Sequence, residues 1–179
     1  MGQSATLYQI DKNDFSKIVD NLNDFSLFDI AKKSATFEKT FEGLRFVLSK
    51  GRDKDEAELV EQIFYPKTFI GEKIDFANLD FKNLPDDFDI FKQPVYYNDP
   101  NKVSNISSFL DTVSVDDFKK LFDPDELNQM NIYPGEVWNR HTEENYAYNE
   151  RDMTNEYKNL KAIFESARIN CGYILSYLG

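Results

Sequence analysis

The chain has 179 residues, of which 41% are hydrophobic and 30% charged. This length fits one domain that buries roughly 70% of its unfolded surface. Its formal net charge of −11 disfavours nucleic acid and anionic lipid as partners. No apolar run approaches the ~20 residues that span a bilayer, and a single cysteine excludes an internal disulfide. We therefore expect a cytoplasmic protein.

The negative charge is concentrated in the middle of the chain. Residues 1–50 contain seven acids and seven bases, residues 51–125 seventeen acids and nine bases, and residues 126–179 eight acids and five bases. An acidic surface favours a basic partner through electrostatic complementarity. Ordinary solubility remains the alternative explanation.

The first 51 residues predict a strand and two helices. Weak alternation over residues 5–10 indicates the strand, and Asp11 is placed to cap the first helix. We expect that helix to bury Phe15, Ile18, Val19 and Leu22. A second helix is predicted to begin at Ser34 or Thr36 and to end at Gly51, with Gly43 allowing close contact with a neighbour. Its expected inward face is Phe37, Phe41, Leu44, Val47 and Leu48.

The middle of the chain predicts three helices and one short strand. An apolar stripe at helical spacing runs through the acidic residues 53–65, and Pro66 helps to end that helix. Residues 66–93 show mixed periodicity, and residues 95–97 are predicted to be a strand. Asp99 and Pro100 then open a helix, and Ser114 with Asp117 resembles a capping box for the next one.

Residues 123–138 are the segment around which we expect the fold to be organised. Asp123 and Pro124 begin a short helix whose Leu127 and Met130 are expected to face inward. Pro134 and Gly135 are expected to form a type II turn. Tyr133 and the only tryptophan, Trp138, are interpreted as core residues.

The end of the chain predicts the longest helix and a final strand. Apolar residues recur every three or four positions from Met153 to Cys171, which predicts the longest helix. Gly172 is suited to end this helix, and residues 173–178 are predicted to form a strand. The fold class is therefore α+β. We predict one domain over residues 1–179, with a small, mostly antiparallel sheet of N- and C-terminal strands plus short central strands, packed against about six helices.

Known catalytic and metal-binding motifs are missing from the sequence. His141 is the only histidine and Cys171, expected in the core, the only cysteine, so zinc sites lack ligands. The sequence from Asp123 departs from a calcium loop at its fifth, sixth and twelfth positions. Paired acids at 86–89, 116–117 and 143–144 leave open a carboxylate-based enzyme. We predict no catalytic residue, no metal and no cofactor.

Tyrosine and arginine in polar surroundings suggest a binding surface, because these residues dominate protein interfaces. The candidate binding residues are Tyr96, Tyr97, Arg140, His141, Tyr146, Tyr148 and Arg151, together with the acids Asp86, Asp87 and Asp89. His141 is interpreted as a surface residue.

The segment Asn131–Trp138 resembles the YfbM-like family of uncharacterised bacterial proteins. Further matches to this family are Tyr8–Asp11, Phe41–Gly51, Asp99–Phe122 and Leu160–Gly172. Tyr96, where we expect a basic residue from the family, and the long stretch 139–152 depart from its pattern. The resemblance implies an α+β domain and no catalytic residue.

Three hypotheses for function follow. The first is a non-catalytic protein-binding module, by analogy an immunity protein that masks a basic bacterial toxin domain. The second is a hydrolase with a carboxylate-based site that involves His141 or Arg140. The third is a housekeeping or scaffold protein.

Overall fold

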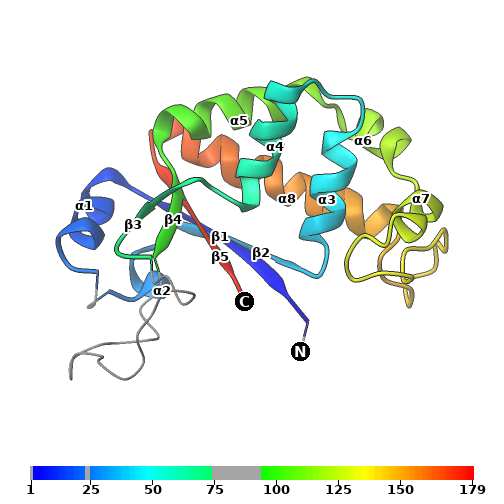
Figure 1. The fold of residues 1–179 in the computed structure, drawn as a ribbon, viewed down its shortest axis with the longest axis horizontal. Helices are drawn as coiled ribbons and strands as arrows, with labels where there is room; N and C mark the ends of the chain where they lie inside the picture. The colour runs from blue at the N-terminus through cyan, green and yellow to red at the C-terminus, as the bar shows by residue number, and fades with distance from the viewer. Residues whose placement is uncertain (1, 23–24, 74–93) are drawn as a thin grey trace.

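A computed structural model describes residues 2–22, 25–73 and 94–179. Its described strands form one five-stranded sheet in the order β2-β1-β5-β4-β3, with every neighbouring pair antiparallel. The strands are β1 (Ser4–Ile10), β2 (Lys33–Glu38), β3 (Thr68–Ile70), β4 (Val95–Asn98) and β5 (Tyr173–Leu178). The first and last strands pair at the centre of the sheet, so the two ends of the chain lie side by side (Figure 1). The α+β class and the antiparallel sheet predicted from the sequence are confirmed.

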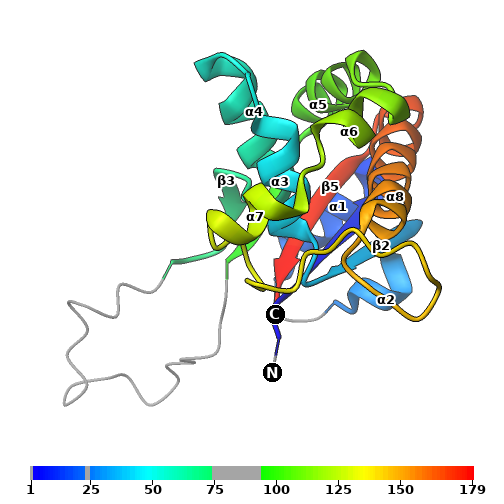
Figure 2. The same ribbon diagram turned by 90° about the vertical axis from the view of Figure 1, so that its right-hand side faces the viewer.

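Helices pack on both faces of the sheet. They are α1 (Lys12–Asp20), α2 (Leu27–Ile30), α3 (Phe41–Ser49), α4 (Lys54–Phe64), α5 (Pro100–Thr112), α6 (Val115–Leu121), α7 (Pro124–Gln129) and α8 (Glu150–Ile169). The larger group, α3 to α8, covers one face, and the short α1 and α2 lie on the other (Figures 1 and 2). None of the helices in the described ranges has the length and apolar character needed to cross a membrane.

Alternation along the strands divides the interior into two clusters. Ala5, Leu7 and Ile174 point towards the larger group of helices. Ile10 and Leu175 point to the opposite face, where Phe15 and Ile18 of α1 cover them. The ring of Phe15 stacks on Tyr173 with 3.8 Å between centroids. Both faces of β1 and β5 are therefore buried around Ile10, Ile174 and Leu175, whereas Tyr177 and Leu178 at the end of β5 are exposed.

Acidic and polar caps start the helices where the sequence predicts. The side chains of Asp11, Asp53 and Asp99 each accept a hydrogen bond from a backbone N–H in the first turn of the following helix. Ser114 does the same for α6, and its hydroxyl also donates to Asp117 at 2.6 Å. Because a cap satisfies an otherwise unpaired backbone amide of the first turn, it favours a helix start without contacts from distant parts of the chain.

The predicted helix start at Ser34 or Thr36 is wrong. Residues 33–38 form β2, which pairs with β1, and α3 begins only at Phe41. Thr36 faces Thr6 across the pair with 3.0 Å between their hydroxyl oxygens. Phe37 is buried in either arrangement. The apolar spacing was therefore compatible with a helix, and pairing with β1 decided the outcome.

Two side chains expected to face inward are exposed. Val19 of α1 is 48% exposed, because Phe15 and Ile18 already fill the contact with the sheet. Met130 is 59% exposed because α7 ends at Gln129, so the helical spacing from Leu127 no longer applies.

The turn after α7 also differs from the prediction. The N–H of Gly135 donates to the carbonyl of Ile132 at 2.9 Å, which makes Tyr133 and Pro134 the central residues. Because the Tyr133–Pro134 peptide is cis, this is a type VI turn rather than the expected type II turn. Gly135 has the expected positive φ, and Asn131, also at positive φ, precedes the turn.

Trp138 connects this turn to the core. Its indole N–H donates to the carbonyl of Ile132 at 2.9 Å, and Asn128 bonds both its N–H and its carbonyl. The ring lies against Gly43 of α3, where a Cβ would stand 2.9 Å from Cζ2. Gly43 thus permits a close approach to a neighbour, as the sequence predicts.

The end of α8 corrects the interpretation of Cys171. The helix ends at Ile169, and Cys171 adopts a φ of 48° and is exposed rather than in the core. Its N–H donates to Arg168, and the N–H of Gly172 donates to Ala167, which is the Schellman arrangement. Gly172 is required for another reason: a Cβ there would stand 2.9 Å from the carbonyl oxygen of Ile10.

Candidate functional site

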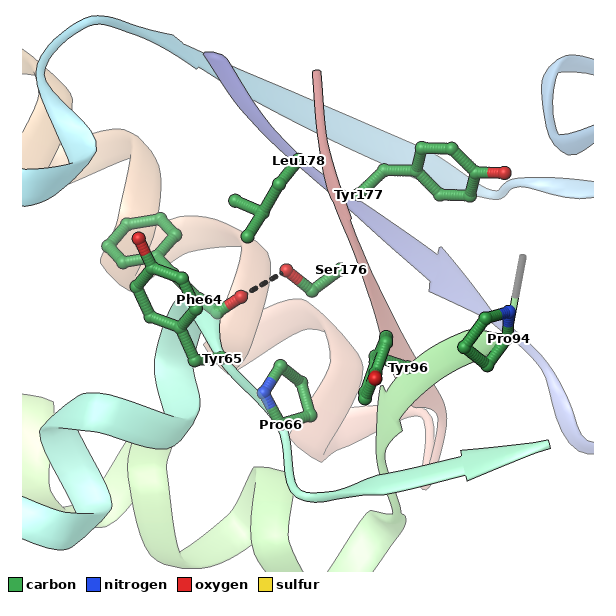
Figure 3. A pocket seen from close by; sticks show the side chains of 8 residues that line it. All are labelled: Phe64, Tyr65, Pro66, Pro94, Tyr96, Ser176, Tyr177 and Leu178. Atoms are coloured by element: carbon green, nitrogen blue, oxygen red, sulfur yellow. Dashed lines mark hydrogen bonds between the residues drawn. The ribbon is translucent and has the colours of Figure 1, made fainter. Parts of the chain in front are cut away.

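An apolar pocket lies where the end of α4 meets the sheet. It has a volume of about 650 Å³ and is lined by Phe64, Tyr65, Pro66, Pro94, Tyr96, Ser176, Tyr177 and Leu178. Figure 3 shows the side chains of Tyr96, Ser176 and Leu178 on the side of the sheet that faces Tyr65 and Pro66, whereas Tyr177 points away. Among the described residues, no charged side chain is part of this lining. The volume and composition fit a site for an apolar group.

Hydrogen bonds between α4 and the sheet hold the floor of the pocket. The hydroxyl of Ser176 donates to the carbonyl of Phe64 at 2.6 Å, drawn as the dashed line in Figure 3. The amide of Asn98 donates to the carbonyl of Gln62 at 2.7 Å. Both are buried, so the last turn of α4 stays fixed relative to β4 and β5.

An ion-pair network supports the wall of the pocket. The hydroxyl of Tyr65 donates to Glu42, and Arg45 pairs with Glu42 and Glu61. Burial and the bond to Glu42 hold the pKa of Tyr65 well above its usual value. Burial alone would lower the pKa of Arg45, but the bonds to both carboxylates raise it. Within the described residues, Glu42, Arg45 and Glu61 are thus paired with one another, and none of their charges is left unpaired at the pocket.

The pocket lies beside an open stretch of strand edge. Ser4 and Gly179 exchange both backbone hydrogen bonds, so the N–H and C=O of the preceding Leu178 point away from β1. The pairing of β4 with β5 ends at Tyr96 and Ser176. The residue that would continue it opposite Leu178 is Pro94, which has no N–H.

Large apolar side chains are exposed around the same edge. Leu178 and Tyr177 are each 46% exposed, and Phe69 of β3 is 40% exposed. The ring of Phe69 lies 5.5 Å from that of Tyr96. A cluster of exposed aromatic and aliphatic groups beside a pocket is typical of an interaction site.

Some of the predicted binding residues gather elsewhere, at a hollow of about 310 Å³ beside α7. Arg140, His141 and Arg151 line it, with Glu150 as its only acid in the described part of the chain. The guanidinium of Arg140 bonds both Asp123 and Asp125 at 2.8–2.9 Å, and these carboxylates raise its pKa.

The other side chains of this hollow also have partners. Arg151 pairs with Asp152 at 3.0 Å, and the ring of His141 stacks on Tyr146 at 4.0 Å. The Nδ1 of His141 is 3.6 Å from Glu143. All of these groups are at the surface. The cations at this hollow are thus already paired, and no base is positioned on a nucleophile.

The remaining predicted residues are divided among other parts of the fold. Tyr97 is half-buried among Phe15 and Tyr173, and burial raises its pKa. Tyr148, expected at the surface, is half-buried with its ring 5.7 Å from Trp138. Of the candidates that the structure describes, Tyr96 alone lines the apolar pocket. Asp86, Asp87 and Asp89 lie outside the described residues.

A recess that sequence reasoning missed lies beside the first two turns of α8. It has a volume of about 370 Å³ and includes Glu38, Asp152 and Glu156 in its wall. Burial, and then the charges of Asp152 and Glu38, raise the pKa of Glu156 from 4.5 to about 7. The position of Glu156, three residues after Met153 and four before Leu160, was the available signal of a carboxyl beside the core.

The described residues contain no cluster of three or more His, Cys, Asp or Glu side chains that suits a metal ion. The apolar pocket has no acid among its described lining residues, and the carboxyls of Glu143 and Glu144 are at the surface.

Comparisons with known proteins show the family to which the chain belongs. The model of a domain of unknown function, DUF1877, matches residues 1–177. The chain belongs to this family. It is similar to the crystal structure of a protein of unknown function, YfbM from Escherichia coli, with a TM-score of 0.61 and 13% sequence identity over 98% of this chain and 99% of that chain. At this identity the likeness concerns the fold alone. The search of curated proteins found no match.

Proposed function

We propose that the protein is a non-catalytic protein-binding module, and that its apolar pocket receives an apolar side chain of the partner. The observation that carries this proposal is the pocket itself, whose described lining residues are uncharged and which has exposed Phe69, Tyr177 and Leu178 around it. Burial of each such side chain contributes about 1.5–3 kcal/mol to association.

The open edge at Leu178 supports an extended partner segment. A backbone that lies along β5 there meets the N–H and C=O of Leu178, which have no backbone partner in the described part of the chain, while a side chain of the same segment reaches the pocket. Main-chain hydrogen bonds with a neighbouring side-chain pocket are the elements of recognition by strand addition.

The partner is a protein with a basic surface. The net charge of −11 favours such a partner, because complementary charge speeds association and disfavours acidic competitors. A secreted bacterial toxin domain that this protein neutralises in the cytoplasm, as an immunity protein does, fits this chemistry.

The test uses the purified product of the adjacent gene and a pair of matched variants. We expect binding that weakens at high salt, and an affinity that falls at least about tenfold in Leu178→Asp. Ile169→Asp introduces the same charge at a side chain that is 70% exposed on the end of α8, and its binding is expected to be unchanged. Absence of binding at low salt, or equal binding by Leu178→Asp, would overturn the proposal.

A carboxylate-based hydrolase is the second candidate. It is favoured by Glu156, whose pKa of about 7 suits a general acid at neutral pH, beside Asp152. Hydrolysis of a glycoside or ester that is lost in Glu156→Gln, with folding intact, would replace the binding-module proposal.

A further inference from the structure

The recess beside α8 is a second site, independent of the apolar pocket. Its wall is formed by residues 38–40 at the end of β2, residues 147–148 before α8, and residues 152, 155 and 156 of α8. It shares no lining residue with the apolar pocket or with the hollow at Arg140. Carboxylates approach it from two elements, Glu38 from β2 and Asp152 with Glu156 from α8.

Two polar atoms of its wall are buried without a hydrogen-bond partner. Thr40 is 6% exposed, and its Oγ1 has no partner. The Oε2 atom of Glu156 is also buried, and it too has no hydrogen-bond partner. A buried oxygen without a partner costs about 1–3 kcal/mol. Because both oxygens are buried, a ligand that brings N–H donors reaches them only when the two side chains rotate towards the recess.

Among the described residues, two cations lie at this recess: Lys39 is part of its wall, and Arg151 pairs with Asp152. Arg151 bonds one oxygen of Asp152 and the carbonyl of Tyr146. The side chain of Lys39 lies over Gly2, where a Cβ would collide with its Cε. Neither cation offsets the negative charges that, together with burial, raise the pKa of Glu156. The recess therefore combines three carboxylates, of which Asp152 alone is in an ion pair within the described residues, with the unpartnered oxygens of Thr40 and Glu156.

We propose that this recess binds a guanidinium group. Its carboxylates do not form a metal cluster within the described residues, so the ligand must present several donors over a wider span. A guanidinium offers five N–H donors in one plane, and it stacks on aromatic rings such as that of Tyr148 in the same wall. It pairs with Glu156 while its remaining donors reach the hydroxyl of Thr40 and the other carboxylates.

Titration of the whole protein with ethylguanidinium chloride at pH 8 tests the site, with the backbone amide signals of Thr40 and Glu156 followed by NMR. Saturable shifts are expected, and an equal concentration of tetramethylammonium chloride, which has no N–H donor, is expected to cause none. Glu156→Gln is expected to weaken binding about tenfold through loss of a charge-assisted bond. Glu165→Gln, which removes an exposed acid from the same helix, is expected to leave it unchanged.

Two further measurements sharpen the test. Thr40→Val removes the hydroxyl without changing charge or shape, and it is expected to weaken binding by a smaller factor. Binding is also expected to weaken about tenfold from pH 8 to pH 5.5, because Glu156 must ionise to pair with the cation. Equal shifts with tetramethylammonium, or unchanged affinity in Glu156→Gln, would overturn the proposal.

The source of the guanidinium is distinguished with two ligands. A capped Gly-Arg-Gly peptide that binds more tightly than free L-arginine indicates a polypeptide ligand, and the reverse order indicates a small molecule. Both results support the guanidinium site.

Discussion

Replacement of Glu156 by Gln is expected to stabilise the protein at high pH and to change nothing at low pH. Folding buries this carboxyl beside Asp152 and Glu38, which raises its pKa from 4.5 to about 7. The folded state therefore binds the proton more tightly than the unfolded state does. The contribution of Glu156 to the free energy of unfolding is fully present below about pH 4.5, and it is lost as the pH rises to about 7.

The magnitude follows from the same two pKa values. A carboxyl displaced from 4.5 to about 7 lowers the free energy of unfolding by at most about 3 kcal/mol once it is fully ionised. Glu156 is only partly buried, and solvent screening reduces this to about 1–2 kcal/mol. Glutamine keeps the shape and avoids the buried charge, so the variant gains that amount at pH 8.

Urea denaturation of both proteins from pH 4 to pH 8 measures this effect. The two unfolding free energies are expected to coincide near pH 4 and to separate between pH 4.5 and 7. Carboxyls with lowered pKa values, such as those of Asp14 and Asp117, lose their contribution at acidic pH in both proteins and cancel in the comparison. Glu165→Gln is the control. If wild type and Glu156→Gln keep a constant difference at every pH, the reasoning is refuted.

Three further substitutions test the packing. Gly43→Ala is expected to destabilise the fold by about 1–3 kcal/mol, because its Cβ would collide with the ring of Trp138; thermal unfolding measures this. Cys171→Gly is expected to stabilise the fold by about 1 kcal/mol, because glycine adopts the left-handed φ of this position without strain. The thiol of native Cys171 is exposed, so it is expected to react with a thiol reagent in the folded protein. Ser176→Ala is expected to cost about 1–3 kcal/mol in urea denaturation, because the carbonyl of Phe64 loses its buried donor.

Matched glycine variants serve as controls. Gly51→Ala meets no atom within 4 Å and has only the cost of its positive φ, so it separates backbone strain from the collision at Gly43. Gly172→Ala is expected to be destabilising, since its Cβ would meet the carbonyl of Ile10. A neutral Gly43→Ala, or a Cys171→Gly that is less stable than wild type, would contradict the packing described above.

Local signals in the sequence were sufficient for most helix starts and for the two central strands. Asp11, Asp53 and Asp99 each satisfy an amide within three residues, so the chemistry that begins the helix is contained in the local sequence. The apolar segment 173–178 after the helix end at Gly172 likewise predicted β5. The sequence also predicted that Gly43 allows close contact with a neighbour, but it did not indicate that this neighbour is Trp138.

Other features depended on contacts between distant parts of the chain. Residues 33–38 carry spacing that suits a helix, and only pairing with β1 makes them a strand. The apolar pocket joins Tyr65, Tyr96 and Leu178, which the order of the strands brings together. The raised pKa of Glu156 requires both burial and the charge of Glu38 from another element.

The sequence alone therefore determined most of the helices, the two central strands, the α+β class and the acidic character of the chain, but not the strand at residues 33–38. Caps, spacing and net charge act over a few residues or over the whole composition, so no knowledge of the fold is needed to read them. The tertiary structure decided where the pocket and the recess lie, because burial and the proximity of charges depend on residues far apart in the chain.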